Sequence, residues 1–236
     1  MDENSIIEIQ DLGFQWNTNN PFLFCVHHKD AYPRGNGKMG PEASLDGRSM
    51  GNDFTLKDGW RMYHGQRIPG FPQHPHRGFE TVTIVLEGMV DHADSMGAAG
   101  RYGHGDVQWM TGGSGVIHQE LPQGDSKGRM EGFQLWANLP AANKMMAPRY
   151  QDNTASQIPT VHLDNGVSIK IICGQVNGTS GSVRNIVIEP EYLDITIPPG
   201  TTYLHPTKAG HTVLAYVIEG EGYFDMQNQA SADNNT

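Results

Sequence analysis

The chain is short of cysteine and has no long apolar run, and each shortage excludes a class of protein. Of its 236 residues only Cys25 and Cys173 are cysteines, and they lie far apart, outside any Cys-x-x-Cys pair. We therefore expect buried free thiols rather than a disulfide framework or a thiolate zinc site. No stretch approaches the roughly 18 apolar residues of a membrane span, and the acidic residues at 1–3 do not resemble a signal peptide. We expect a cytoplasmic protein without membrane contact.

Basic residues are also in the minority, which excludes a direct grip on nucleic acid. Lys and Arg total 16 against 26 Asp and Glu, a formal net charge of −10. Binding a phosphate backbone requires a basic stripe, and this sequence has none. Any role near DNA would therefore run through a partner protein.

Gly and Pro separate short runs of Val, Ile, Thr and aromatic residues, a pattern typical of many strands. The clearest strand lies within 78–88, where Glu80, Val82 and Ile84 alternate with Thr81 and Thr83. This period of two predicts one inward face, which would include Glu80. Further strands are predicted at 22–26, 106–110, 116–121, 133–139, 168–173, 183–188, 192–197 and 212–218. The fold class is therefore all-β, a sandwich or barrel.

We divide the chain into an N-terminal domain (1–137), a connector (138–160), a partial C-terminal domain (161–224) and a polar tail (225–236) that we expect to be disordered. A long excursion near 30–70 is rich in Gly and polar residues and leads directly into His74. Loops of this length are often functional lids, so a lid and a passive surface loop are both open. In the connector, 139–148 could hold one or two helical turns before Pro148.

Two short runs, His-Pro-His at 74–76 and His-Gln-Glu at 118–120, place pairs of metal-type donors at strand spacing. Residues i and i+2 share one face of a strand about 6.6 Å apart, whereas a helix would turn them to different sides. A single histidine is more often a surface or hydrogen-bonded residue, but two such pairs indicate a metal site. The predicted ligands are His74, His76, His118 and Glu120.

Three neutral imidazoles and one carboxylate would leave two of six octahedral positions open, which is typical of non-heme iron oxygen chemistry. Donors without thiolate suit Fe(II), Mn, Ni, Cu or Zn. The site would keep about one positive charge and attract a phenolate, enolate or carboxylate. Glu80 is a competing ligand or an outer partner that orients an imidazole, and we favour the outer partner. One of His27 and His28 could face the core, and non-ligand roles are expected for His64, His92, His104, His162, His205 and His211.

Longer motifs around these residues resemble the pirin family of the cupin superfamily. They are HPHRGFETVT at 74–83, GDVQWMT at 105–111, GVIHQE at 115–120 and QLWANLP at 134–140. With Lys144 and the run 148–151, the similarity spans most of 21–222. The resemblance implies a bicupin of two β-jelly-roll barrels, with iron in the N-terminal one. At matching positions its ligands are His74, His76, His118 and Glu120, and Fe(II) is the expected metal, with Mn, Ni, Cu, Zn and Co as alternatives.

The sequence departs from the family pattern in three places. Gln119 replaces the usual serine between the ligands, and the excursion before His74 is longer than in the plainest members. After Phe224 a pirin would continue through several more strands, roughly 50 residues at one strand per 8 to 12 residues. We therefore expect an incomplete second barrel in a truncated or naturally shortened chain. Its unpaired strand edges predict self-association through the C-terminal half.

The resemblance implies two alternative functions. The first is an iron-dependent dioxygenase that opens the ring of a flavonol such as quercetin, a small anionic aromatic substrate whose hydroxyl proton Glu120 or Glu80 would accept. The second is a redox-responsive co-regulator that binds a partner protein without catalysis. Its basis would be the one-unit charge change on oxidation, felt over a Debye length of about 8–10 Å. We favour the enzyme because the site is open, and a cupin without chemistry is disfavoured because all four ligands are present.

Overall fold

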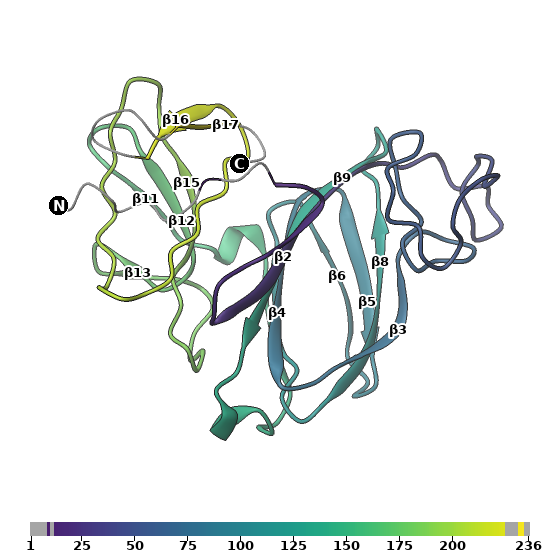
Figure 1. The fold of residues 1–236 in the computed structure, drawn as a ribbon, viewed down its shortest axis with the longest axis horizontal. Coiled ribbons are helices and arrows are strands. Elements are labelled where there is room, and N and C mark those ends of the chain that lie inside the picture. Colours follow the sequence, from purple (N-terminus) through teal and green to yellow (C-terminus); the bar gives the residue numbers. More distant parts are fainter. Residues whose placement is uncertain (1–8, 10–11, 225–230, 234–236) are drawn as a thin grey trace.

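The computed structural model describes residues 9, 12–224 and 231–233, which form two lobes (Figure 1). The N-terminal lobe is a sandwich of two antiparallel sheets. The six-stranded sheet runs in the order β1 (Gln15–Asn17), β2 (Phe22–Ala31), β9 (Arg129–Asn138), β4 (Phe79–Glu87), β7 (Val107–Thr111) and β10 (Arg149–Asn153). The four-stranded sheet runs β3 (Phe71–His76), β8 (Val116–Gln123), β5 (Met89–Asp94) and β6 (Ala99–Gly103).

The second lobe is smaller, and its described residues do not close into a barrel. Its three-stranded sheet contains β11 (Thr160–His162), β12 (Ser168–Cys173) and β15 (Tyr192–Thr196), and its two hairpins pair β13 (Gln175–Val176) with β14 (Thr179–Ser180) and β16 (Glu221–Tyr223) with β17 (Ser231–Asp233). In the part of the chain that the structure describes, the helices are two 3-10 turns, η1 (Ala141–Asn143) and η2 (Ala155–Gln157), within the predicted connector. Neither turn could cross a membrane. The all-β class is confirmed, and β10 of the connector belongs to the first sheet because it pairs with β7.

Strand β4 is buried on both faces, and the predicted inward position of Glu80 is wrong. Val82 and Ile84 pack with Trp109 of β7 against Ile172 of the second lobe. By alternation Glu80 shares this seam between the lobes, where its carboxylate accepts a 2.6 Å hydrogen bond from the Thr111 hydroxyl. The side chains of Thr81 and Thr83 therefore face the barrel interior. The period of two was correct. The apolar face of β4 nevertheless points into the seam between the lobes and not into the barrel, because the seam is the more apolar of the two environments.

The turn between β4 and β5 shows why glycine separates the strands. Gly88 has φ of +78°, and a Cβ atom there would lie 2.5 Å from the carbonyl oxygen of Gln123. Any side chain would therefore force β4 and β8 apart at this end of the sandwich. The same end holds a small core of Val85, Val90 and Met130.

Two predicted strands are absent. In 183–188 only Val183 forms a bridge, to Cys173, although Val183 and Ile186 are buried in the seam. Asn185 has φ of +57°, which breaks the extended backbone that a ladder requires. The segment 212–218 is likewise no strand: it is attached through side chains, with Tyr216 stacked on Trp16 of β1.

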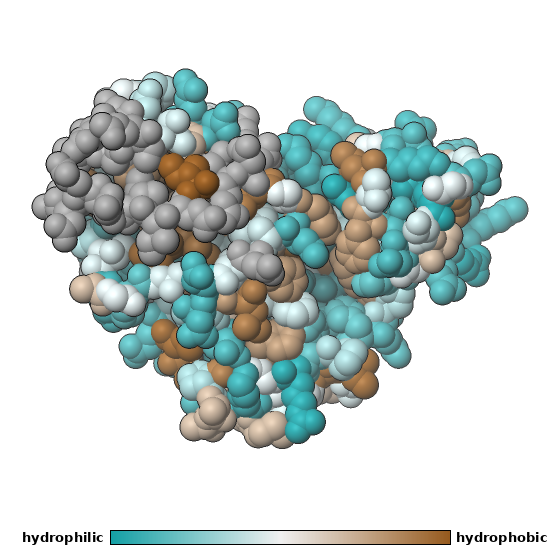
Figure 2. Space-filling view, viewed as in Figure 1, coloured by the Kyte–Doolittle hydropathy of each residue, from teal (hydrophilic) through white to brown (hydrophobic). Residues whose placement is uncertain are grey.

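The excursion is a folded insertion at one end of the sandwich, and Figure 2 shows much of its surface as hydrophilic. Its centre is Arg48, whose buried guanidinium lies 3.6 Å from the Trp60 ring and donates to Asp53 at 2.9 Å. Tyr63, fully buried, stacks on Phe71 at the start of β3 and also donates to Asp30 of β2. The insertion therefore closes the end of the barrel where β3 begins.

The predicted disordered tail is described only in part. Ser231–Asp233 pairs with Glu221–Tyr223 and Ala232 is buried, so disorder is wrong for these three residues. The rest of 225–236 lies outside the described residues.

Burial raises the pKa of Glu80, so its ionised form costs folding stability. The native state then holds this proton to higher pH than the unfolded chain, and stability is lost as pH rises through the native pKa. Glu80→Gln keeps the acceptor for Thr111 and cannot ionise. We expect its free energy of unfolding in urea, relative to wild type, to increase from about pH 4 to pH 8. Exposed Glu221→Gln is the control, and a pH-independent difference for Glu80→Gln would contradict the assignment.

Candidate metal centre

The pairing of β3 with β8 assembles three histidines. In this ladder His74 lies opposite His118 and His76 lies opposite Val116, so all three imidazoles share the inner face. β3 is an edge strand, which allows Pro75 between the two histidines because its missing N–H is not needed on the open side. The sequence and the register together fix the position of the site.

The histidine nitrogens are spaced as ligands of one ion would be. One ligand atom from each of His74, His76 and His118 lies within 4.8 Å of the others, and the Nε2 atoms of His74 and His118 are 3.1 Å apart. Two nitrogens bound at about 2.0–2.1 Å to a common zinc ion would lie roughly 3 Å apart. Among the described residues no other group of His, Cys, Asp and Glu meets this criterion.

The protonation state of the histidines also fits a metal. Burial, reinforced by His118 and His74, lowers the pKa of His76 to about 3, and burial lowers the pKa of His118. Both imidazoles are therefore neutral near pH 7, the form that binds metals. The Nε2 atom of His76 is buried without a hydrogen-bond partner in the described structure. A bound cation would satisfy this nitrogen.

Glu120 lies beside the histidines and is held in place from two sides. Its Oε2 atom is 3.8 Å from the Nε2 atom of His118. The amide of Gln134 donates to both carboxylate oxygens, at 3.1 and 3.2 Å, and the Tyr102 hydroxyl donates to Oε1 at 3.3 Å. The structure thus brings the three predicted histidines together, whereas Glu120 lies near His118 but outside the group whose ligand atoms are all within 4.8 Å of one another.

Gln134 and Trp136 form a support that the sequence motifs did not assign. The indole N–H of Trp136 donates to Gln134 at 3.0 Å, while its ring packs edge-on against His76, with ring centroids 5.1 Å apart. Trp136 therefore packs against the predicted ligand His76 and, through Gln134, orients Glu120. A glutamine flanked by Phe133 and Leu135 in the middle of the strand was the signal that could have indicated this role.

The other histidines and the glutamate considered from sequence lie on different faces of the sheets, some inside the barrel and some outside it. His28 faces the interior and contacts the Tyr63 hydroxyl, whereas His27 faces outward and contacts Glu131. His92, expected to stand alone, lies opposite Glu120 across the β5–β8 ladder and is buried. Glu80 is on the far face of β4, so it neither orients an imidazole nor reaches the site.

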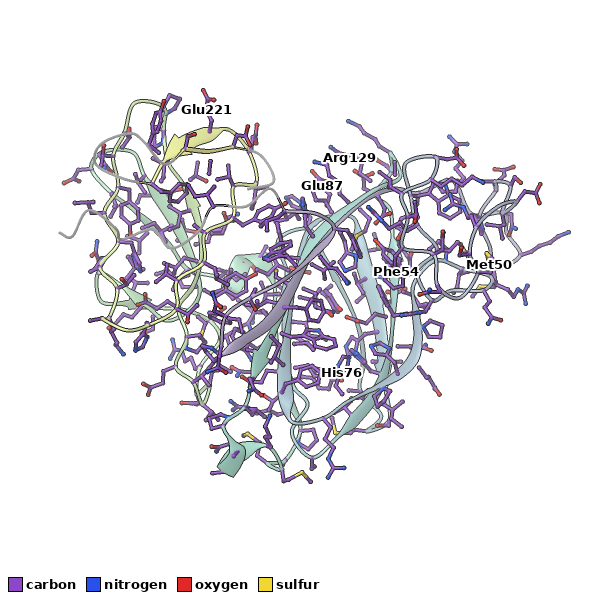
Figure 3. The ribbon with its side chains drawn as sticks, in the orientation of Figure 1. Met50, Phe54, His76, Glu87, Arg129 and Glu221 are labelled. Atoms are coloured by element: carbon purple, nitrogen blue, oxygen red, sulfur yellow. The ribbon has the colours of Figure 1, made fainter. Side chains whose placement is uncertain are left out.

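The interior offers little space behind Glu120. A cavity of about 20 Å³ lies between His28 and Glu120, room for about one water molecule. The folded excursion closes this end of the barrel, and Figure 3 shows its residues Met50 and Phe54 well away from His76. The excursion is therefore not placed as a lid over the histidines. A larger ligand would approach from the opposite end, where His74 is only half-buried.

Comparison with known proteins yields one consistent family. A family model described as Pirin matches residues 17–137. A pirin-like protein of Caulobacter vibrioides is 45% identical over 155 residues, covering 65% of this chain and 56% of that protein. The chain thus spans about half the length of the curated relatives it matches.

Solved structures extend the likeness to both lobes. A protein of Geobacillus kaustophilus matches with a TM-score of 0.62 and 30% identity, over 93% of this chain and 71% of that one. A quercetin 2,3-dioxygenase of Acinetobacter baumannii matches with a TM-score of 0.61 and 28% identity, over 92% of this chain and 65% of that one.

The support of Glu120 can be tested by Gln134→Leu, which removes the two hydrogen bonds from the Gln134 amide, leaves that of Tyr102 and keeps a similar volume. Loss of an outer hydrogen-bond partner typically costs 10–100-fold in metal affinity, and we expect a loss in that range from chelator competition. His76→Ala should cost more, and His162→Ala, an exposed histidine, should cost nothing. Wild-type affinity in Gln134→Leu would show that Glu120 needs no such support.

Proposed function

The chain belongs to the pirin family, and we propose that it is a metal-dependent dioxygenase that opens the ring of a flavonol such as quercetin. The observation that carries the proposal is the convergence of three imidazoles beside a supported carboxylate at the open end of a barrel. The likeness to a quercetin 2,3-dioxygenase over 92% of this chain supports the substrate class.

His74, His76, His118 and Glu120 would hold the metal, and Fe(II) is the ion we propose, with Mn, Ni, Cu, Zn and Co as alternatives. Bound here, a non-heme ion with open positions would supply Lewis-acid and redox activation of the flavonol and of dioxygen. The absence of thiolate donors is consistent with this choice, because both cysteines are buried elsewhere.

Glu120 is also the base that we propose for the substrate. Its Oε2 atom faces His118. A flavonol hydroxyl that enters from the open end of the barrel beside His74, which we call the mouth, would meet this oxygen. Gln134 and Tyr102 donate hydrogen bonds to this carboxylate, which fixes its position for receiving the proton. Glu80, the other base predicted from sequence, is excluded by its position in the seam.

The side chains at the mouth are complementary to an anionic aromatic ligand. Arg77 follows His76 and is exposed, with its guanidinium beside Met145 of the connector. Phe79 and Trp136 lie next to each other, with ring centroids 4.5 Å apart, and both contact His76. A planar phenolate could therefore meet a cation and aromatic edges as it approaches the imidazoles.

The direct test is oxygen uptake and carbon monoxide release with quercetin, using protein loaded in turn with Fe, Mn, Ni, Cu, Zn and Co. We expect turnover with at least one metal, reduced to background in His76→Ala and unchanged in His162→Ala. No turnover with any metal in the series would contradict the proposal.

The half-buried position of His74 also favours a second candidate, a co-regulator whose partner senses the iron oxidation state. Oxidation of an iron ion bound here would add one positive charge close to the surface. A partner protein docked within a Debye length of about 8–10 Å would sense that charge. Affinity capture from a cell extract with ferrous and ferric protein would distinguish the two candidates. A partner retained equally in both states would exclude redox-dependent binding.

A further inference from the structure

The second lobe contains a cavity of about 390 Å³ that the metal centre does not use. Its volume is within the roughly 300–1,000 Å³ of small-molecule sites. The cavity lies beside the core of Val167, Ile169 and Ile171, onto which the Tyr203 ring packs. One wall is therefore fixed by packing rather than by surface loops alone.

Three polar side chains on this wall form a hydrogen-bonded chain. His205 contacts Glu191 through Nε2 at 2.8 Å and the Tyr203 hydroxyl through Nδ1 at 3.0 Å. The position of Glu191 is also set by Gly174, where a Cβ atom would lie 2.8 Å from the Glu191 Cγ atom. The chain is thus oriented from both ends.

The direction of these hydrogen bonds determines what the wall can recognise. A carboxylate accepts only, so His205 donates to Glu191 from Nε2, and in the tautomer with no proton on Nδ1 it accepts there from the Tyr203 hydroxyl. The Tyr203 proton is then committed, and lone pairs of Tyr203 and Glu191 remain for a ligand. The wall therefore favours ligands with several donors.

The remaining polar groups narrow the ligand further. Asn165, Gln175 and Asn177 also line the cavity, and their amides both donate and accept. Among the described residues that line it, none is Lys or Arg, so no cation is present to hold an anion. Hydroxyl groups, which also donate and accept, match this set better than an ammonium group, which only donates.

We propose that this cavity binds a neutral polyhydroxylated small molecule of the sugar class, independently of the metal centre. Glu191 and Tyr203 of the hydrogen-bonded chain would accept hydrogen bonds from the ligand's hydroxyl groups. The three amides would both donate hydrogen bonds to these hydroxyl groups and accept hydrogen bonds from them.

Saturation-transfer NMR on the full chain, with D-glucose, D-xylose and myo-inositol as probes and choline as the cationic comparison, tests the proposal. We expect transfer to at least one of the three polyols and none to choline. Affinity should fall about tenfold in Glu191→Gln and in Tyr203→Phe, the loss expected for one hydrogen bond to a charged or oriented group.

Glu221→Gln, on exposed strand β16, is the matched control and should bind as wild type, as should His76→Ala. Tyr203→Phe keeps the ring that packs on the core, so a folded spectrum is expected. Transfer to none of the polyols, equal transfer in wild type and both cavity variants, or binding of choline in their place would overturn the proposal.

Discussion

The register between β3 and β8 is the constraint on which the site depends. Because this ladder sets His74 opposite His118, the spacing within each run becomes a shared position in space. A shift of one residue would turn an entire set of donors to the outer face. The edge position of β3 tolerates Pro75, while the excursion, anchored by Tyr63 beside Phe71, fixes where the strand starts. The imidazoles are thus positioned by the backbone before any ion is bound.

The two faces of the six-stranded sheet serve different purposes. The inner face presents Gln134 and Thr83 to the interior, where they hydrogen-bond, and Gln134 also holds Glu120. The outer face presents Val82, Ile84 and Trp109, which pack against the second lobe in an apolar seam. Glu80 is the exception in that seam, buried with one strong donor. The polar groups near the candidate site therefore lie inside the barrel, while the apolar contacts that join the lobes lie outside it.

The parts of the fold that follow from local pattern could be predicted from sequence. Strand spacing and donor spacing are local, so β4, β8 and β12 were predicted correctly, as was the convergence of the three histidines. The side of β4 that faces inward is not local, because both sides are buried and the inner one is polar. The strand predicted at 183–188 failed for a similar reason, since its apolar residues pack without a ladder partner.

Apart from the convergence of 74–76 with 118–120, long-range contacts could not be predicted from the sequence. Nothing in the sequence pairs Trp136 with His76, seats the excursion at the closed end of the barrel, or brings Glu191 to His205. Donor spacing and the pirin resemblance predicted the same four ligands, but the support of Glu120 and the cavity in the second lobe came from the structure. The candidate sites in this chain are therefore built from groups that are separated in sequence and brought together only by the fold.

Anomalous diffraction at the iron edge, from crystals of iron-loaded protein, tests the central claim most directly. The account predicts one peak within bonding distance of the His74, His76 and His118 nitrogens and of the Glu120 carboxylate. A peak bound elsewhere, or none beside these imidazoles, would contradict it.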